Sequence, residues 1–376
     1  MGNVVPGCCR SIDNTAESTP QGFTPPIVDS SRRTNPDLHD ASSANNSTHD
    51  PRMPSIDVTT EKSQRLPESN NGSACAPRPR LLELCGVSDE EMRVLEAAIY
   101  GDVSVLQRLL AARADANTTS AFGRSALHFA AARGQSAAAR VLLDAKADVN
   151  ACLGDNYTPL LAAMQQDNDD IVHVLLAAKA DANIGSNSFE FPLLYAARNN
   201  RAGIVGALLA ARANIEAYDR DGNTALALAA RQGYGQVVQA LLTARAAVHT
   251  SNICGASPLW LAAAYGHVDI AQALLASNAD VTQRNHEGDT AVAVAAKTGR
   301  VDMLRVLLGA QPAALEMVNV WRQSPLLLAA VYGETEALQV LLLAAIELAQ
   351  HGVIQEHGDM RIGGTGGSDT RDYATQ

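Results

Sequence analysis

A period of 33 residues constrains this chain more than any other feature of its sequence. The block SALH begins at Ser125, and related blocks begin 33 residues apart at Thr158, Phe191, Thr224, Ser257 and Thr290, with a seventh at Ser324 after a step of 34. One period before Ser125, the segment MRVLEAA at Met92 keeps the later part of the pattern. A fixed period of this length is typical of stacked structural repeats. The sequence therefore predicts a repeat domain of about eight units over residues 88–350.

Particular columns of the repeat predict two helices in each unit. Alanine stands five residues after each block origin, at Ala97, Ala130, Ala163, Ala196, Ala229, Ala262, Ala295 and Ala329, and a Leu-Leu pair recurs from 109–110 to 341–342. The Ser or Thr that opens most blocks can cap a helix, and the Pro at the second position of four blocks suits the first helical position. Glycines at 101, 134, 233, 266, 299 and 333 suit the left-handed residue that ends a helix. We expect a short first helix and a second helix whose Leu pair points inward.

These residues carry a resemblance to a known family. The segments SALHFAAARGQSAAARVLLDAKADVN and SPLWLAAAYGHVDIAQALLASNADV resemble ankyrin repeats, whose pattern is close to GxTPLHxAAxxGHxxVVxLLxxGADVN. The resemblance implies an all-α solenoid of helix-turn-helix units with protruding β-turn fingers. It also implies that the protein binds other proteins through the concave face formed by the fingers and first helices. His128 falls at the histidine of the family pattern, so we expect a structural hydrogen bond there rather than catalysis.

The sequence departs from the family pattern at two places. Where the family has Gly before Ala-Asp, this chain has Arg113, Lys146, Lys179, Arg212, Arg245 and Asn278. A cation suits the negative end of a helix dipole, so we interpret this ladder as structural, with a functional basic stripe as the alternative. In the unit that begins at Phe191, Phe replaces the capping Ser or Thr and Asn200 replaces Gly. We expect a distorted finger around Gly185–Glu190.

The two ends of the array need residues that cover their open faces. At the front, Ser88 and Glu91 are spaced as a capping box, and Asp89 and Glu90 suit the positive end of a helix. At the back, no ninth unit covers four apolar residues, Leu343, Ile346, Leu348 and Ile354. We expect the last helix to fold back on itself, and a contact with a partner is the alternative.

Composition changes on both sides of the array. Residues 1–80 hold ten of the fifteen prolines and long polar stretches such as ASSANNSTHD. Such a segment cannot bury enough apolar surface to offset its ordering entropy, so we predict a disordered tail with a root-mean-square span of about 50 Å. Residues 352–376, which include GGTGGSD, are predicted to be a second, short disordered tail.

Several functional classes are excluded by charge and motif content. The net charge is −11, and most of it belongs to the residues after the first tail, which argues against nonspecific nucleic-acid binding. The six cysteines show no zinc-site spacing, and no secretory signal or transmembrane stretch is present. No catalytic signature of the common enzyme classes appears. We predict an intracellular, non-catalytic protein with no cofactor, no metal and no small-molecule substrate.

The variable positions of the repeat supply the candidate binding residues. They lie at the finger tips and just after the Ala column, and the candidates are Arg124, Tyr157, Arg198, Arg220, Arg231, Gln232, Tyr265, Lys297 and Trp321. Tyr, Trp and Arg dominate the energetics of protein interfaces. We predict a surface centred on Arg198, Arg231, Tyr265 and Lys297 that binds an acidic peptide or protein. The alternative is that these arginines are simply solvated.

The first ten residues, MGNVVPGCCR, resemble an acylation signal. Gly2 is the residue that receives myristate, although Pro6 stands where the signal favours Ser or Thr. One myristoyl chain gives only reversible membrane binding, with a constant of about 10⁴ M⁻¹, and Cys8 and Cys9 offer palmitoylation sites as the second signal. We predict a scaffold anchored to the inner leaflet, on the cytoplasmic face of a membrane. The alternative is an unlipidated adaptor or inhibitory subunit in the cytosol or nucleus.

Overall fold

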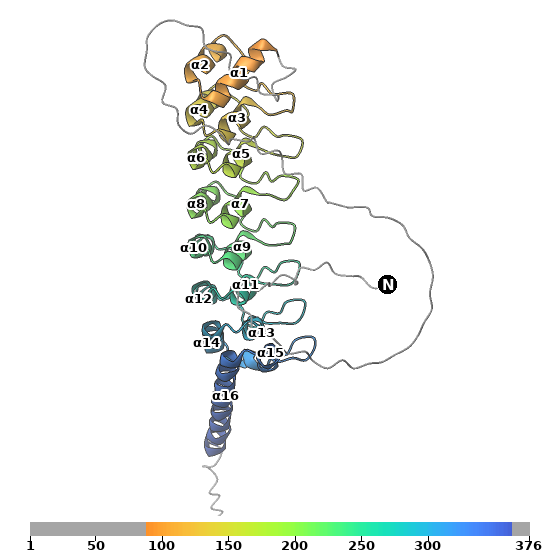
Figure 1. The fold of residues 1–376 in the computed structure, drawn as a ribbon. Helices are drawn as coiled ribbons and strands as arrows, with labels where there is room; N and C mark the ends of the chain where they lie inside the picture. The colour runs from red at the N-terminus through yellow and green to blue at the C-terminus, as the bar shows by residue number, and fades with distance from the viewer. Residues whose placement is uncertain (1–87, 363–376) are drawn as a thin grey trace, which may run out of the picture. The chain divides into compact units, whose positions relative to one another are not determined.

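The computed structural model describes residues 88–362, with side-chain surroundings up to residue 350, and the described residues form eight helix pairs. The first helices of the pairs are α1 (Asp89–Tyr100), α3 (Ala126–Ala132), α5 (Pro159–Gln165), α7 (Pro192–Arg198), α9 (Ala225–Gln232), α11 (Pro258–Tyr265), α13 (Ala291–Lys297) and α15 (Pro325–Tyr332). The second helices are α2 (Val103–Ala111), α4 (Ser136–Asp144), α6 (Asp169–Ala177), α8 (Ala202–Ala210), α10 (Gly235–Thr243), α12 (Val268–Ala276), α14 (Val301–Ala310) and α16 (Thr335–Ile362). In Figure 1 the two sets form neighbouring rows, and the finger loops project beyond the row of first helices.

Helix starts follow the predicted capping pattern. A hydroxyl accepts a hydrogen bond from the third helical amide at Ser125, Thr158, Thr224, Ser257, Thr290 and Ser324. The capping box before α1 is confirmed, because the Ser88 amide donates to Glu91 Oε2 at 2.9 Å and the Glu91 amide donates to Ser88 Oγ at 3.3 Å. Phe191 is the N-cap residue of α7 and makes no capping hydrogen bond, because its apolar side chain has no acceptor atom. Helix α7 therefore lacks a bond worth about 1 kcal/mol.

Left-handed residues end both helices of most units. The predicted glycines have φ near +70 to +80°, and Asp167 and Asn200 adopt the same conformation in the units without Gly, with φ of 55° and 56°. The ladder of cations is also left-handed, from Arg113 with φ of 70° to Arg245 with φ of 65°. These cations therefore stand where predicted, at the carboxyl ends of the second helices, where the negative end of the helix dipole stabilises them.

The ladder stops at Gln311, which has φ of −145°. Pro312 follows, and its ring excludes Gln311 from the helical region of backbone space. The chain instead forms a short 3₁₀ helix, η2 (Pro312–Glu316), which buries Ala314 and Leu315. This local change accounts for the single step of 34 residues in the repeat.

The core is continuous along the array. The Ala column is fully buried or nearly so in all eight units, and the first Leu of the pair is fully buried in every unit after the first. Small alanines let neighbouring helices approach closely, and each buried Leu contributes about 1.5–3 kcal/mol. Each unit is therefore stabilised mainly by the unit beside it.

The predicted distortion around Gly185–Glu190 is wrong. The Ser186 amide donates to the Glu190 carbonyl at 3.1 Å, and the Asp219 amide makes the same bond to the Asn223 carbonyl at 3.1 Å in the next finger. The finger keeps its fold because Phe189 takes the left-handed conformation, with φ of 62°, that Gly222 takes in that finger. A bulky residue rarely adopts this conformation, so the sequence anomaly produces local strain rather than a different loop.

Backbone hydrogen bonds join some neighbouring fingers but not all of them. Four amides each donate to the preceding finger, namely Asn187 to Asp155 O (2.9 Å), Ile253 to Asp221 O (2.9 Å), His286 to Cys254 O (3.0 Å) and Val320 to Glu287 O (3.0 Å). Within residues 88–362 no such bond links residues 119–124 to 152–157, or residues 186–190 to 219–223. The last four fingers therefore form one hydrogen-bonded ladder.

Helix α16 differs from the prediction for the end of the array. Instead of folding back, the helix continues to Ile362, so residues 352–362 of the predicted tail are helical. Leu343 and Ile346 are 61% and 54% exposed, Leu348 is half-buried, and the side chain of Ile354 lies outside the described part. No helix among the described residues has the length and apolar character needed to cross a membrane.

Replacing Phe189 by Gly is expected to raise the free energy of unfolding by about 1 kcal/mol, because Gly adopts positive φ without strain. Urea unfolding monitored by circular dichroism measures the change. Gly288 holds the same column in another finger, and a Cβ added there would lie 2.8 Å from the Val320 backbone nitrogen. Gly288→Ala should therefore destabilise the protein. A destabilised Phe189→Gly variant would contradict the strain argument.

Candidate functional site

Two cation–aromatic pairs lie on the first helices and repeat the same geometry. The guanidinium carbon of Arg231 lies 5.5 Å from the centroid of the Tyr265 ring, and Lys297 Nζ lies 5.2 Å from that of Tyr332. In each pair the cation is seven residues after its block origin, and the tyrosine is eight residues after the next origin. Three predicted binding residues therefore belong to one repeated arrangement. We call Arg231, Tyr265, Lys297 and Tyr332 the cation–aromatic face.

Trp260 extends the cation–aromatic face and was missed by the sequence analysis. The half-buried indole packs with Tyr265 against Ala227, Ala256 and Leu261. Alanine occupies the column of Trp260 in the units on both sides, at Ala227 and Ala293, which leaves room for the large ring. The indole Nε1 is buried and has no hydrogen-bond partner among the described residues. The sequence feature that could have identified this residue is the Trp in the block SPLW, at a position where the neighbouring units have Ala.

Arg198 is held by a finger rather than by the cation–aromatic face. Its Nη2 donates to Asp219 Oδ2 at 3.2 Å. The Asp219 carboxylate also accepts the amides of Asp221 and Asn223, at 3.0 and 2.9 Å, and its side chain is only 11% exposed. The Arg198 guanidinium is therefore partly used to stabilise the base of that finger.

Tyr157 and Arg124 are also built into the scaffold. The Tyr157 hydroxyl donates to Gln165 Oε1 at 2.8 Å, and Gln165 Nε2 donates to Glu190 Oε2 at 3.2 Å. Burial raises the pKa of Tyr157 to about 12. Arg124 is half-buried, and its charge partly opposes the burial that raises the pKa of Tyr157 and adds to the burial that lowers the pKa of His128. The hydrogen bonds from Tyr157 through Gln165 to Glu190 therefore connect one unit to the finger of the next.

The remaining predicted residues lie on the surface. Arg220 and Trp321 stand at finger tips, and Gln232 follows Arg231 at the end of α9. All three are exposed, and Trp321 is 59% accessible. A binding partner can contact these side chains without any rearrangement of the fold.

His128 makes the structural hydrogen bonds expected of it. Ser125 Oγ lies 2.8 Å from His128 Nδ1, and His128 Nε2 lies 2.9 Å from the Tyr157 carbonyl oxygen of the next unit. The Ser125 amide also donates to Nδ1, at 3.2 Å, so Nε2 carries the proton that is donated to Tyr157. Burial is the main cause of the lowered pKa of His128. This neutral imidazole ties one block to the finger of its neighbour.

A column of hydrogen-bond donors connects several units to the first helix of the preceding unit. In these units, the residue just before the second helix bonds to a backbone carbonyl at the end of the first helix of the preceding unit. Asn168 Nδ2 contacts Ala131 O at 3.0 Å, Arg201 Nη1 contacts Met164 O at 2.8 Å, and His267 Nε2 contacts Arg231 O at 3.1 Å. Arg201 also pairs with Asp167 and Asp169. The sequence analysis did not predict this column, although polar side chains recur at 33-residue intervals there.

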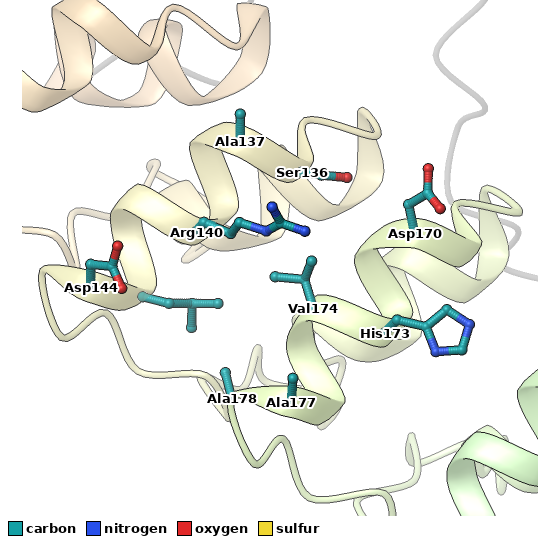
Figure 2. A pocket seen from close by; sticks show the side chains of 10 residues that line it. Ser136, Ala137, Arg140, Asp144, Asp170, His173, Val174, Ala177 and Ala178 are labelled. Atoms are coloured by element: carbon teal, nitrogen blue, oxygen red, sulfur yellow. The ribbon is translucent and has the colours of Figure 1, made fainter.

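An open groove lies on the opposite row of helices, between α4 and α6 (Figure 2). It has a volume of about 800 Å³ and an apolar floor that includes Leu143 and Val174. Arg140 and Asp144 come from α4, and Asp170 and His173 come from α6. None of the predicted binding residues lines this groove. Its charged groups are solvent-exposed and of both signs, so the groove shows no preference for one ligand charge.

The described residues contain no group of three or more His, Cys, Asp or Glu side chains placed to hold a metal ion. Cys152 donates to the Asn150 carbonyl at 3.1 Å, and neither Cys152 nor Cys254 forms a disulfide. The predicted lipidation sites Gly2, Cys8 and Cys9 lie outside the described residues.

Comparison with known proteins identifies the repeat. A family model described as ankyrin repeats (3 copies) matches residues 94–187, 180–252 and 259–351, which together are about two thirds of the chain. The matched ranges include all eight helix pairs, at least in part. A search of curated proteins found no match.

Protonation of His128 is expected to destabilise the protein. The unfolded chain binds this proton near pH 6.5 and the folded chain only at lower pH, so stability is constant above about pH 6.5 and falls as the pH drops below it. His128→Leu, with the residue found at Leu161 and Leu194, should lower stability at neutral pH by about 1–2 kcal/mol and flatten its pH dependence. Urea titrations at several pH values test this, with His173→Leu as the control. An unchanged pH dependence in His128→Leu would contradict it.

Proposed function

Because this chain belongs to the ankyrin-repeat family, we propose that it is a non-catalytic scaffold that binds another protein on its fingers and first helices. Ankyrin repeats suggest protein–protein interaction in general. The observation that supports this surface is the cation–aromatic face with Trp260 beside it. Arg, Tyr and Trp are the residue types that contribute most to protein interfaces.

An acidic segment is the partner chemistry that we propose. The net charge of the chain is −11, so Arg231 and Lys297 are cations on a chain that is negative overall. A ring beneath each cation orients it, with about 0.5–1 kcal/mol per exposed pair. An Arg guanidinium held in this way can donate two parallel hydrogen bonds to a carboxylate. A partner segment with carboxylates and an apolar anchor would match both the cations and Trp260.

Binding to acidic peptides selected from a display library should depend on the cation–aromatic face. The double change Arg231→Ala and Tyr265→Ala is expected to weaken binding of the full chain at least about tenfold, because truncation of an interface hot spot costs about 2 kcal/mol or more. Affinity should also fall with added salt. Fluorescence anisotropy measures both effects. Arg140→Ala, in the groove between α4 and α6, is the control and should bind normally.

A different outcome would exclude this surface. Equal binding by the double variant and the unaltered chain would place the partner elsewhere. A loss of binding in Arg140→Ala but not in the double variant would place it on the α4–α6 groove. Circular dichroism spectra of each variant establish that the array is still folded.

We further propose that the scaffold is held at a membrane by acylation of Gly2 and of Cys8 or Cys9. The support is the sequence alone: Gly2 behind the initiator Met, an uncharged Asn3, and a cysteine pair within the first ten residues. Two acyl chains give stable anchoring where one does not. The alternative, an unlipidated adaptor or inhibitory subunit, keeps the same binding surface without the membrane.

Intact mass of the protein from eukaryotic cells tests the acylation proposal. We expect added mass for one myristoyl group and for palmitate, of which hydroxylamine removes only the thioester-linked palmitate. Gly2→Ala and the pair Cys8→Ser and Cys9→Ser should each move the protein from the membrane fraction to the cytosol. Cys75→Ser is the matched control and should fractionate normally. An unmodified mass would support the unlipidated alternative.

A further inference from the structure

The last unit exposes several large apolar side chains on both of its helices. Leu327 and Val331 of α15 and Leu342, Leu343 and Ile346 of α16 are all exposed, with accessibilities from 44% to 62%. We call these five residues the C-terminal face. Among the described residues, the first unit exposes one large apolar side chain, Tyr100, and only to 38%. The two ends of the array therefore differ sharply.

Two residues of the C-terminal face, Leu327 and Leu342, continue the interface on which the whole array is built, because their columns are buried or half-buried in all earlier units. Leu327 occupies the column of His128, and His128 contacts the Tyr157 carbonyl of the following unit. Val331 occupies the column of Arg231, which packs on Tyr265 of the following unit. The second Leu of the pair is buried or half-buried in all earlier units, and Leu342 alone is exposed. A surface shaped to accept the next helix pair is left without one.

Helix α16 adds an arm to this face. It continues from Ile346 to Ile362, which at 1.5 Å per residue is about 24 Å beyond the apolar residues of the last unit. In Figure 1 this part of the helix projects away from the stacked pairs. In the sequence, Val353 and Met360 follow Ile346 at intervals of seven, with Leu342, Ala349 and the charged residue Glu356 at the intermediate positions. This spacing is that of a coiled-coil seam.

We propose that the C-terminal face and α16 form an interface with a second copy of this chain, related by a two-fold axis. In such an arrangement each copy places its arm along the arm or end face of the other, so the same residues are buried on both sides. Stacking of the C-terminal face on the first unit of another copy is disfavoured. That end has little exposed apolar surface and begins with the acidic residues Asp89, Glu90 and Glu91.

Sedimentation velocity of the full chain tests this proposal over two decades of micromolar concentration. We expect the mass of a dimer that dissociates on dilution. The double change Leu343→Glu and Ile346→Glu should give a monomer at all these concentrations, because burial of four carboxylates in a two-fold interface is strongly unfavourable. Both residues are exposed in the single chain, so the fold should tolerate the change, which circular dichroism checks.

A matched control locates the interface. Phe122 is 68% exposed at the tip of the first finger, and Phe122→Glu should leave the dimer intact. Val353→Glu, in the projecting part of α16, should also yield a monomer and provides a second variant if the first one unfolds. If the unaltered chain is a monomer at every concentration, the proposal is wrong. The C-terminal face would then be covered by something other than a second copy, such as residues 1–87 or another protein. A dimer that persists in both α16 variants would overturn the proposal as well.

Discussion

No unit of this chain can bury its own apolar surface, and the rest of the structure depends on that constraint. Each helix pair has an Ala column on one helix and a Leu pair on the other, which become buried when a neighbouring unit packs against them. Contacts therefore run between adjacent units, and stability is a sum of unit and interface terms. The same constraint explains why the period is so strictly kept: an insertion would misalign every column after it. The one insertion, at Pro312, is absorbed in a 3₁₀ helix before the last unit.

Polar side chains fix the position of one unit relative to the next, where apolar packing alone would allow more than one arrangement. His128, Asn168, Arg201 and His267 each reach a carbonyl of an adjacent unit. Fingers are joined by a second set of bonds, which is continuous over the last four fingers and interrupted between residues 186–190 and 219–223. Side chains that serve neither purpose, such as Arg220, Gln232 and Trp321, are exposed. A binding surface arises in this fold from positions that stacking does not use.

Much of this organisation could be predicted, and the misses have physical causes. Period, helix pairs, caps and left-handed residues follow from local chemistry, so Ser125, Gly233 and Arg245 behave as their residue types require. The finger around Gly185–Glu190 was predicted to be distorted because Phe191 and Asn200 depart from the repeat pattern, and Phe189 in this finger adopts an unfavourable left-handed conformation. The hydrogen bonds of this finger and those of the neighbouring finger outweigh that unfavourable conformation. For the candidate site, residue types were predictable but not their partners. Arg198 pairs with Asp219, 21 residues away, whereas Arg231 lies over Tyr265.

The sequence by itself determined the family, the number of units and the character of their ends, because these depend on residue type at fixed spacing. Only the tertiary structure decided which cations are held by carboxylates and which lie over rings, since that depends on the offset between successive units. It also decided that the last helix projects instead of folding back. A helix continues through its own hydrogen bonds, whereas folding back requires a turn and a partner surface. The apolar residues that end the array thus remain exposed in the single chain.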